Sequence, residues 1–387
     1  MMRRILIGRS LRGFADGFIA VVLPAYLLSL GHGLLEVGII STATLLGSAL
    51  STLAVGRWGH RFSIRRLLLT ASLLMAATGF GFAGFSSFWP LFLVAAVGTL
   101  NPSSGDASVF MPLDHTMLAT QPDRTAVFAR YTFLGSMAGA LGALASGVPE
   151  WLEISLHWMF VLYGAMGLVV WLLYLGLPDP KSEEQKPAVP LGPSRGIVWR
   201  LAALFSIDAF AGGLVLNSLL ALWLFERFGM SLGAAGAFFF WTGLLSAVSQ
   251  LAAGPLARRI GMVNTMVFTH IPSSLFLIGA ALAPSLELAL GLLLARSLLS
   301  QMDVPARGAF VMSVVTPAER PAAASFTAVP RSLAAALSPT LTGAMFAAGA
   351  MAAPLVACGV LKIAYDLALF AAFRRAEARN AVSSTST

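Results

Sequence analysis

The sequence Asn101-Pro-Ser-Ser-Gly-Asp106, followed by Pro112-Leu-Asp-His115, interrupts an apolar segment that covers about residues 89–119. A second apolar segment, about residues 286–315, carries Ser300-Gln-Met-Asp-Val-Pro-Ala-Arg307 at nearly the same depth. The two central aspartates, Asp106 and Asp303, lie 197 residues apart. A charged side chain at the centre of a membrane helix costs at least about 2.5–3.5 kcal/mol on insertion scales. Two acidic interruptions at matching places in two halves predict a membrane transporter built from a repeat.

The composition indicates an integral membrane protein. Of the 387 residues, 57% are hydrophobic and 11% are charged, whereas soluble domains carry about 25% charged residues. The single cysteine, Cys358, excludes an intrachain disulfide and lies in an apolar run, so we predict an inert thiol. The first apolar run, about residues 11–30, contains Asp16 and lacks a clear small-residue cleavage site. We therefore predict a retained membrane span there and not a signal peptide.

About twelve apolar segments of spanning length follow one another along the chain. The predicted fold is all-α and integral to the membrane, with twelve transmembrane helices in two six-helix bundles. The predicted spans are 11–31, 36–56, 66–87, 89–119, 127–148, 156–178, 200–225, 232–255, 263–284, 286–315, 323–348 and 352–373. The predicted parts are an N-terminal bundle (1–178), a polar, proline-rich cytoplasmic linker (179–199), a C-terminal bundle (200–375) and a disordered cytoplasmic tail (376–387).

The distribution of lysine and arginine predicts the orientation in the membrane. Most of these residues fall at the termini, in the linker and in loops on one side, whereas the opposite loops carry mainly acids. The positive-inside rule therefore places both termini in the cytoplasm. The predicted location is the inner membrane. The net charge of +8 is explained by this topology and not by nucleic-acid binding.

Two pairs of cytoplasmic turns repeat between the halves. Gly56-Arg-Trp-Gly-His-Arg61 corresponds to Gly254-Pro-Leu-Ala-Arg-Arg259 at an offset of 198 residues. Pro122-Asp-Arg124 corresponds to Pro317-Ala-Glu-Arg320 at an offset of 196 at the arginine. Six helices repeated in parallel around a linker predict a six-plus-six architecture.

With these turns, the whole chain resembles the major facilitator superfamily. That family carries G-x-x-x-D-(R/K)-x-G-(R/K)-(R/K) between helices 2 and 3, but here His60 stands at the aspartate and Ser63 at the second glycine. In the family the aspartate locks the outward-facing state, so the resemblance implies a lock that is weaker, pH-dependent or made by other residues. The resemblance implies gating roles for residues of the cytoplasmic turns: Gly56, Arg61, Arg65, Arg66, Arg124, Arg259 and Arg320.

Ionisable residues inside the predicted helices are the candidate substrate and proton sites. In the family, helices 1, 4, 7 and 10 line a central cavity, and carboxylates in such a place can bind protons. The candidates are Asp16, Asp106, Asp114, Asp208, Asp303, Arg307 and Arg331. The alternative is that these charges only pair with one another and hold helices together, as Asp303 and Arg307 could, one helical turn apart.

Other polar residues of the helices receive structural interpretations. We predict that Lys362 and Asp366 form an i,i+4 pair, and that His115 and His270 are buried core residues. The prolines Pro102 and Pro305 are predicted to bend or open their helices. No metal-ligand spacing, phosphate-binding glycine loop or catalytic arrangement stands out, so we predict no metal, no cofactor, no use of ATP and no enzyme activity.

These observations predict a secondary transporter that works by alternating access and is driven by protons. Export of a small organic compound is favoured, because an apolar cavity with few acids suits neutral or cationic solutes. Uptake of an organic anion or metabolite, contacted by Arg307 and Arg331, is the alternative. Metal-ion export, lipid movement and ligand sensing are further alternatives. The predicted partners are membrane lipids, a small-molecule substrate and protons, and the family resemblance implies a monomer.

Overall fold

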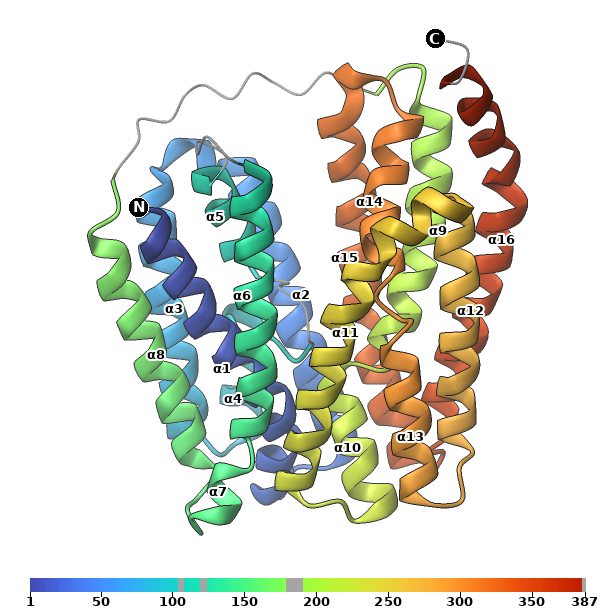
Figure 1. Ribbon diagram of the computed structural model, residues 1–387. Helices are drawn as coiled ribbons and strands as arrows, with labels where there is room; N and C mark the ends of the chain where they lie inside the picture. Colours follow the sequence, from blue (N-terminus) through green and yellow to red (C-terminus); the bar gives the residue numbers. More distant parts are fainter. Residues whose placement is uncertain (104–107, 119–123, 179–190, 385–387) are drawn as a thin grey trace. The chain divides into compact units, whose positions relative to one another are not determined.

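The computed structural model describes residues 1–103, 108–118, 124–178 and 191–384, which are mainly helical (Figure 1). In the first half the helices are α1 (Met2–Ser29), α2 (Leu34–Trp58), α3 (Ile64–Gly84), α4 (Phe88–Val97), α5 (Phe110–Leu118), α6 (Arg124–Ala145), α7 (Val148–Trp151) and α8 (His157–Leu175). In the second half they are α9 (Arg195–Gly213), α10 (Asn217–Phe228), α11 (Leu232–Ile260), α12 (Met262–Ala281), α13 (Leu286–Ser297), α14 (Asp303–Val314), α15 (Arg320–Ala347) and α16 (Ala353–Ser384). Two short 3-10 helices are η1 (Gly59–Arg61) and η2 (Pro317–Glu319).

The predicted twelve-helix membrane fold is confirmed. Within the described residues, 9 segments are long and apolar enough to cross a membrane. The interrupted segments α4–α5 and α13–α14, together with the less apolar α15, supply the remaining spans. The last helix, α16, continues through Ser384, across most of the tail for which the sequence predicts disorder.

Both predicted helix interruptions are present. Helix α4 ends at Val97 and α5 begins at Phe110, while α13 ends at Ser297 and α14 begins at Asp303. Backbone groups at membrane depth need partners wherever a helix is broken. In the first interruption the Asn101 side chain accepts a hydrogen bond from the Ser103 amide at 3.1 Å, and the Pro102 carbonyl accepts one from the Ser218 amide at 3.2 Å. Two backbone groups at the break, the Ser103 amide and the Pro102 carbonyl, thus have partners outside a helix.

The described chain divides into two compact units. The first unit contains residues 1–186, 215–244 and 336–350, and the second contains 187–214, 245–335 and 351–387. Segments from the second half of the sequence therefore pack in the first unit: Thr340 Oγ1, for example, hydrogen-bonds Thr42 Oγ1 at 2.8 Å. The boundaries at residues 178 and 200 proposed for two six-helix bundles stay a prediction.

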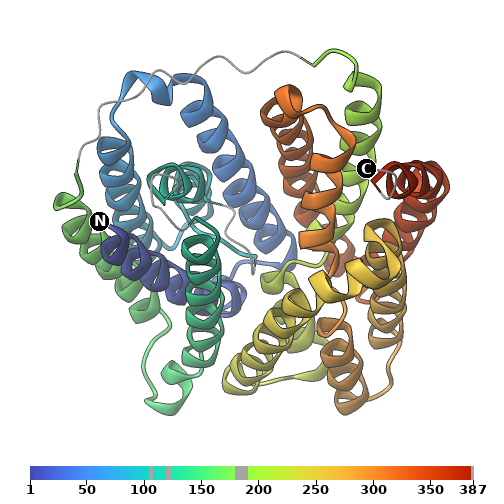
Figure 2. The same ribbon diagram turned by 45° about the horizontal axis from the view of Figure 1, so that its top comes forward.

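Close helix packing organises the interior of each unit. In the first unit α1 packs along α6 and α3 along α8. A Cβ added to Gly142 of α6 would lie 2.0 Å from the Phe14 carbonyl oxygen of α1, so a small residue is needed where these two helices meet. In the second unit α12 packs along α16 (Figures 1 and 2), beside a core that includes Phe205, Phe310 and Tyr365.

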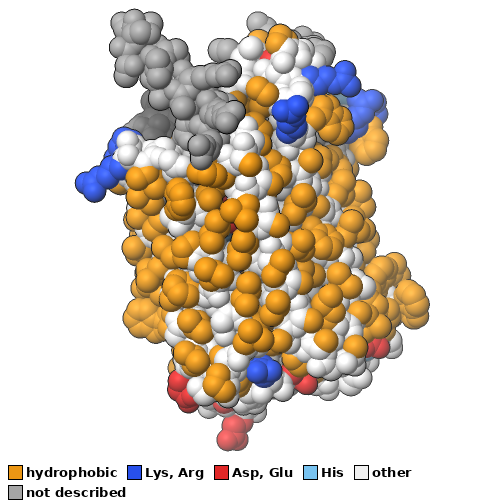
Figure 3. Space-filling model, turned by 90° about the vertical axis from the view of Figure 1, so that its right-hand side faces the viewer, with side chains coloured by type: hydrophobic (Ala, Val, Ile, Leu, Met, Phe, Trp, Pro, Cys, Tyr) orange, Lys and Arg blue, Asp and Glu red, His pale blue; other side chains and the backbone are white. Residues whose placement is uncertain are grey.

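The surface of the helices is apolar, as a membrane requires. Large side chains such as Leu251, Trp89 and Leu172 are 76%, 70% and 60% exposed. On the face shown in Figure 3, hydrophobic side chains cover the middle, most Lys and Arg side chains lie towards one end, and Asp and Glu side chains lie mainly towards the other. This arrangement matches the charge asymmetry read from the sequence.

Candidate functional site

Six buried ionisable side chains meet in the second unit, carried by α9, α12, α14 and α16. Each of them is less than a tenth exposed. We call this group the Asp208 cluster: Asp208, His270, Asp303, Arg307, Lys362 and Asp366. Buried charges in a membrane protein face the bundle interior, pair with one another and mark substrate or proton paths.

Asp208 of α9 lies at the centre of the cluster. Lys362 Nζ donates a hydrogen bond to Asp208 Oδ1 at 2.6 Å, and Arg307 Nη1 lies 3.2 Å from Asp208 Oδ2. Arg307 also donates to Asp303, one turn earlier on α14, which confirms the predicted i,i+4 pairing. Two cations therefore contact two of the three carboxylates.

The third carboxylate, Asp366, has a different partner. His270 Nδ1 lies 3.1 Å from Asp366 Oδ1 and 3.0 Å from Asp366 Oδ2. His270 Nε2 lies 3.4 Å from Lys362 Nζ. The predicted pairing of Lys362 with Asp366 is therefore wrong, because Lys362 reaches across to α9 instead. The prediction of His270 as a core residue is correct about its burial but misses its contacts with three charged groups, since His270 Nε2 also lies 3.9 Å from Asp208 Oδ1.

A second buried cluster lies in the first unit, and we call it the Arg12 cluster: Arg12, Asp114, Tyr131 and Tyr174. Arg12 Nη2 lies 2.5 Å from Asp114 Oδ2, and the two side chains are 3% and 0% exposed. The Tyr131 hydroxyl donates to Asp114 Oδ2 at 3.0 Å, and Arg12 also donates to the Tyr174 hydroxyl. Arg12 of α1 is thus held in the interior by its partner on α5.

The two clusters occupy matching positions with opposite charges. Helices α5 and α14 each have a proline as third residue and an ionisable side chain as fifth, Asp114 in one and Arg307 in the other. Their partners, Arg12 and Asp208, lie 196 residues apart, the same offset as between the repeated cytoplasmic arginines. An arginine–aspartate pair in the first half thus corresponds to an aspartate–arginine pair in the second.

The structure describes two of the three remaining predicted substrate and proton residues. Asp16 is half-buried on α1. The Arg331 side chain on α15 is exposed. Asp106 lies outside the described residues. Reasoning from the sequence brought Asp208, Asp303 and Arg307 to one site but gave no role there to His270, Lys362 or Asp366.

The predicted gating residues lie at helix ends. Arg65 donates to the Leu175 carbonyl at the end of α8, and Arg320 Nε donates to the Met312 carbonyl at 3.2 Å. Arg61 and Arg66 are exposed, as is His60 at the aspartate position of the family motif. The side chain of Arg124 lies outside the described residues. The gating roles of this set, Gly56 and Arg259 included, stay a prediction.

Glu319 joins the start of α9 to the turn before α15. Its carboxylate accepts hydrogen bonds from the Ser194 and Thr316 hydroxyls, both at 2.6 Å, and from the Gly192 amide. These donors, Ser194 first, lower the pKa of Glu319 from its ordinary 4.5 to about 2, because they stabilise the charged form. The acid thus ties the residues that enter α9 to the loop between α14 and α15.

Replacing Glu319 with glutamine is expected to lower stability at neutral pH. Because the pKa of Glu319 is depressed, its stabilisation is present above pH 4.5 and is lost as the pH falls towards 2. The difference in melting temperature between native and Glu319→Gln protein should therefore shrink through this window, as thermal unfolding in detergent at several pH values would measure. A difference that stays constant from pH 7 to pH 3 would contradict this role.

Similarity to known proteins establishes the family. Residues 5–302 match the Major Facilitator Superfamily, and the chain belongs to it. The uncharacterized membrane protein YJR124C of Saccharomyces cerevisiae is 21% identical and covers 95% of this chain and 93% of its own length. The nucleoside transporter NupG has a TM-score of 0.76 at 15% identity, over 96% of this chain and 98% of its own. A D-xylose-proton symporter has a TM-score of 0.75 at 15% identity, over 95% and 97%. The chain is a multi-pass membrane transporter, and the structural likeness shows the shared fold.

Proposed function

We propose that this transporter moves a small organic solute and that the Asp208 cluster couples the movement to protons. The observation that carries the proposal is the partner of Asp366. Two carboxylates of the cluster contact an arginine or a lysine, whereas Asp366 contacts His270, which can exchange a proton. The His270–Asp366 pair is therefore the place where the cluster gains or loses a proton.

The contacts of the pair provide a path for coupling. His270 Nε2 lies against Lys362 Nζ, and Lys362 in turn donates to Asp208. A positive charge gained on His270 repels Lys362, which weakens the hold of α16 on α9. Arg296 and Arg331 add positive charge around the cluster. Proton binding thus changes the contacts between helices, as alternating access requires.

The membrane location, the direction of transport and the coupling to protons are also part of the proposal. The family fold and the arginine-rich turns support an inner-membrane location with both termini in the cytoplasm. A neutral or cationic organic compound is the favoured solute, because the cluster pairs its own charges internally. Export is the favoured direction. The D-xylose-proton symporter has the same fold, which supports proton coupling on this architecture.

Proteoliposomes with an interior pH dye test the proposal against a panel of organic solutes. A solute that drives proton flux through the native protein should drive none through Asp366→Asn or His270→Gln, because neither variant can exchange a proton at the pair. Solute counterflow without a pH gradient should persist in both variants. His157→Gln, at the start of α8 and outside the cluster, is the matched control and should behave like the native protein. Proton flux that survives both substitutions would overturn the proposal.

Transport of an organic anion is the second candidate, and Arg331 favours it. Arg307 is buried and paired with two aspartates, whereas the exposed Arg331 has no carboxylate within ion-pair distance among the described residues. An anionic solute would therefore contact Arg331 first. Arg331→Gln is expected to raise the KM of an anionic solute while leaving a neutral solute unchanged, in uptake assays with both. An equal effect on both solutes would exclude an anion-binding role.

A further inference from the structure

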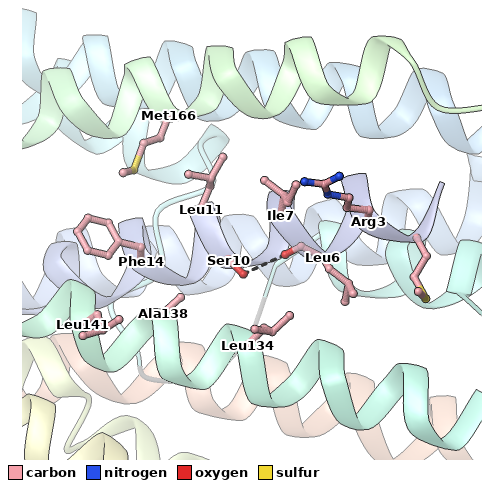
Figure 4. Close-up of a pocket in the computed structure, with 11 residues that line it drawn as sticks. Arg3, Leu6, Ile7, Ser10, Leu11, Phe14, Leu134, Ala138, Leu141 and Met166 are labelled. Carbon is pink, nitrogen blue, oxygen red and sulfur yellow. Dashed lines mark hydrogen bonds between the residues drawn. The ribbon is translucent and has the colours of Figure 1, made fainter.

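A long apolar groove lies along α1 in the first unit. It encloses about 830 Å³, within the range of roughly 300–1,000 Å³ that is typical of ligand sites. Figure 4 shows α6 on one side and Met166 of α8 on the other, with side chains from Arg3 to Phe14 of α1 between them. The groove shares no lining residue with the Asp208 cluster or the Arg12 cluster.

The lining of the groove suits a hydrocarbon chain. Its walls are made by residues such as Leu6, Leu11, Phe14 and Leu134. Ser10 is the one uncharged polar side chain among them, and its hydroxyl donates to the Leu6 carbonyl of its own helix at 3.0 Å. Between Leu6 and Phe14 the lining therefore offers no free hydrogen-bond donor, and an apolar occupant fits it.

The length of the groove matches one leaflet of a bilayer. Phe14 follows Arg3 by eleven positions, which is about 16 Å along a helix that rises 1.5 Å per residue. Half of a hydrocarbon core about 30 Å thick is about 15 Å. An acyl chain that enters at Arg3 would thus reach Phe14 near the middle of the membrane.

The end of the groove at Arg3 is positively charged. Arg3 is exposed and makes no hydrogen bond or ion pair within the part of the chain that the structure describes. Arg4 lies against Gly176, where an added Cβ would overlap its guanidinium, and Arg65 donates to the carbonyl of the adjacent Leu175. Three guanidinium groups thus gather where α1 begins and α8 ends.

We propose that this groove binds an anionic phospholipid, with one acyl chain between α1 and α6 and the phosphate on Arg3. Basic side chains between transmembrane helices at the membrane surface recognise anionic headgroups in this way. The charge at one end selects the headgroup, and the apolar lining holds the chain. This lipid site is separate from the proposed coupling cluster, so neither proposal depends on the other.

Spin-labelled phosphatidylglycerol and phosphatidylcholine, each added to the protein in phosphatidylcholine nanodiscs, test the proposal. The native protein should immobilise phosphatidylglycerol in preference to phosphatidylcholine. Arg3→Gln should weaken the preference by about fivefold, the contribution of one basic residue near the membrane surface. Ala138→Phe fills the groove from α6 and should reduce the immobilised fraction of both lipids. Arg195→Gln and Ala165→Phe, which lie outside the groove, are matched controls and should change neither.

Three results would overturn the proposal. Equal immobilisation of the two lipids by the native protein would show that the groove does not select an anionic headgroup. Unchanged lipid signals in both Arg3→Gln and Ala138→Phe would show that the lipid binds elsewhere. If Ala138→Phe abolished binding of a transported apolar solute while leaving the lipid signal intact, the groove would be a solute site.

Discussion

Replacing Asp208 with asparagine is expected to abolish transport and to lower the free energy of unfolding by about 3–5 kcal/mol, the usual effect of removing one partner of a buried ion pair. The carboxylate accepts from Lys362 Nζ at 2.6 Å and lies 3.2 Å from Arg307 Nη1. Arg307 retains Asp303, but Lys362 would be left as a buried ammonium beside His270. Unfolding by SDS in mixed micelles measures the stability, and solute counterflow in liposomes measures the transport.

A double-mutant cycle separates this electrostatic effect from a general loss of packing. Asp208→Asn combined with Lys362→Met removes both buried charges, so the double variant should be more stable than Asp208→Asn alone. Glu226→Gln, an exposed acid of α10, is the control and should change stability by less than about 0.5 kcal/mol. Additive losses in the double variant would mean that Asp208 and Lys362 do not stabilise one another.

The helices and most of their interruptions could be predicted because they depend on local chemistry. An apolar run of spanning length has to form a helix in lipid, and Asn101-Pro102 removes a backbone donor where the helix then opens. The interruption between α9 and α10 was not predicted. Gly212 and Gly213 immediately precede it, and this pair of weak helix formers was the available signal.

The partners inside the clusters could not be predicted in the same way. Local spacing favoured Lys362 with Asp366, but which side chains meet depends on the rotation of each helix about its axis. In the structure α16 turns Lys362 towards α9 and Asp366 towards α12. The sequence therefore predicts which helices carry the charged residues and how deep in the membrane they lie. Which side chains pair with one another can be read only from the packing of the helices. The offset of 196 residues between Arg12 and Asp208 was a further signal of a repeated site that the sequence analysis did not use.

Replacing Arg12 with alanine is expected to lower the free energy of unfolding by about 3–5 kcal/mol, as much as Asp208→Asn. Asp114 is fully buried and would lose its guanidinium partner, while the hydroxyl donors Tyr131 at 3.0 Å and Tyr174 at 3.4 Å stay in place. SDS unfolding measures the loss. Asp114→Asn should be milder, because its amide oxygen still accepts from Arg12 and the tyrosine. If Arg12→Ala lowered the free energy of unfolding less than Asp114→Asn does, the ion pair between Arg12 and Asp114 would not be what stabilises the first unit.

Exchanging the charges tests the reversed symmetry of the two clusters. Arg12→Asp with Asp114→Arg would give the first unit the order that the second unit has naturally, with aspartate on α9 and arginine on α14. If the backbone positions are equivalent, the exchanged pair should recover part of the stability that Arg12→Asp alone loses. No recovery would mean that the tyrosine hydroxyls around Asp114 fix the sign of the charge. In that case the repeat would preserve the positions of the two pairs while each half requires its own polarity.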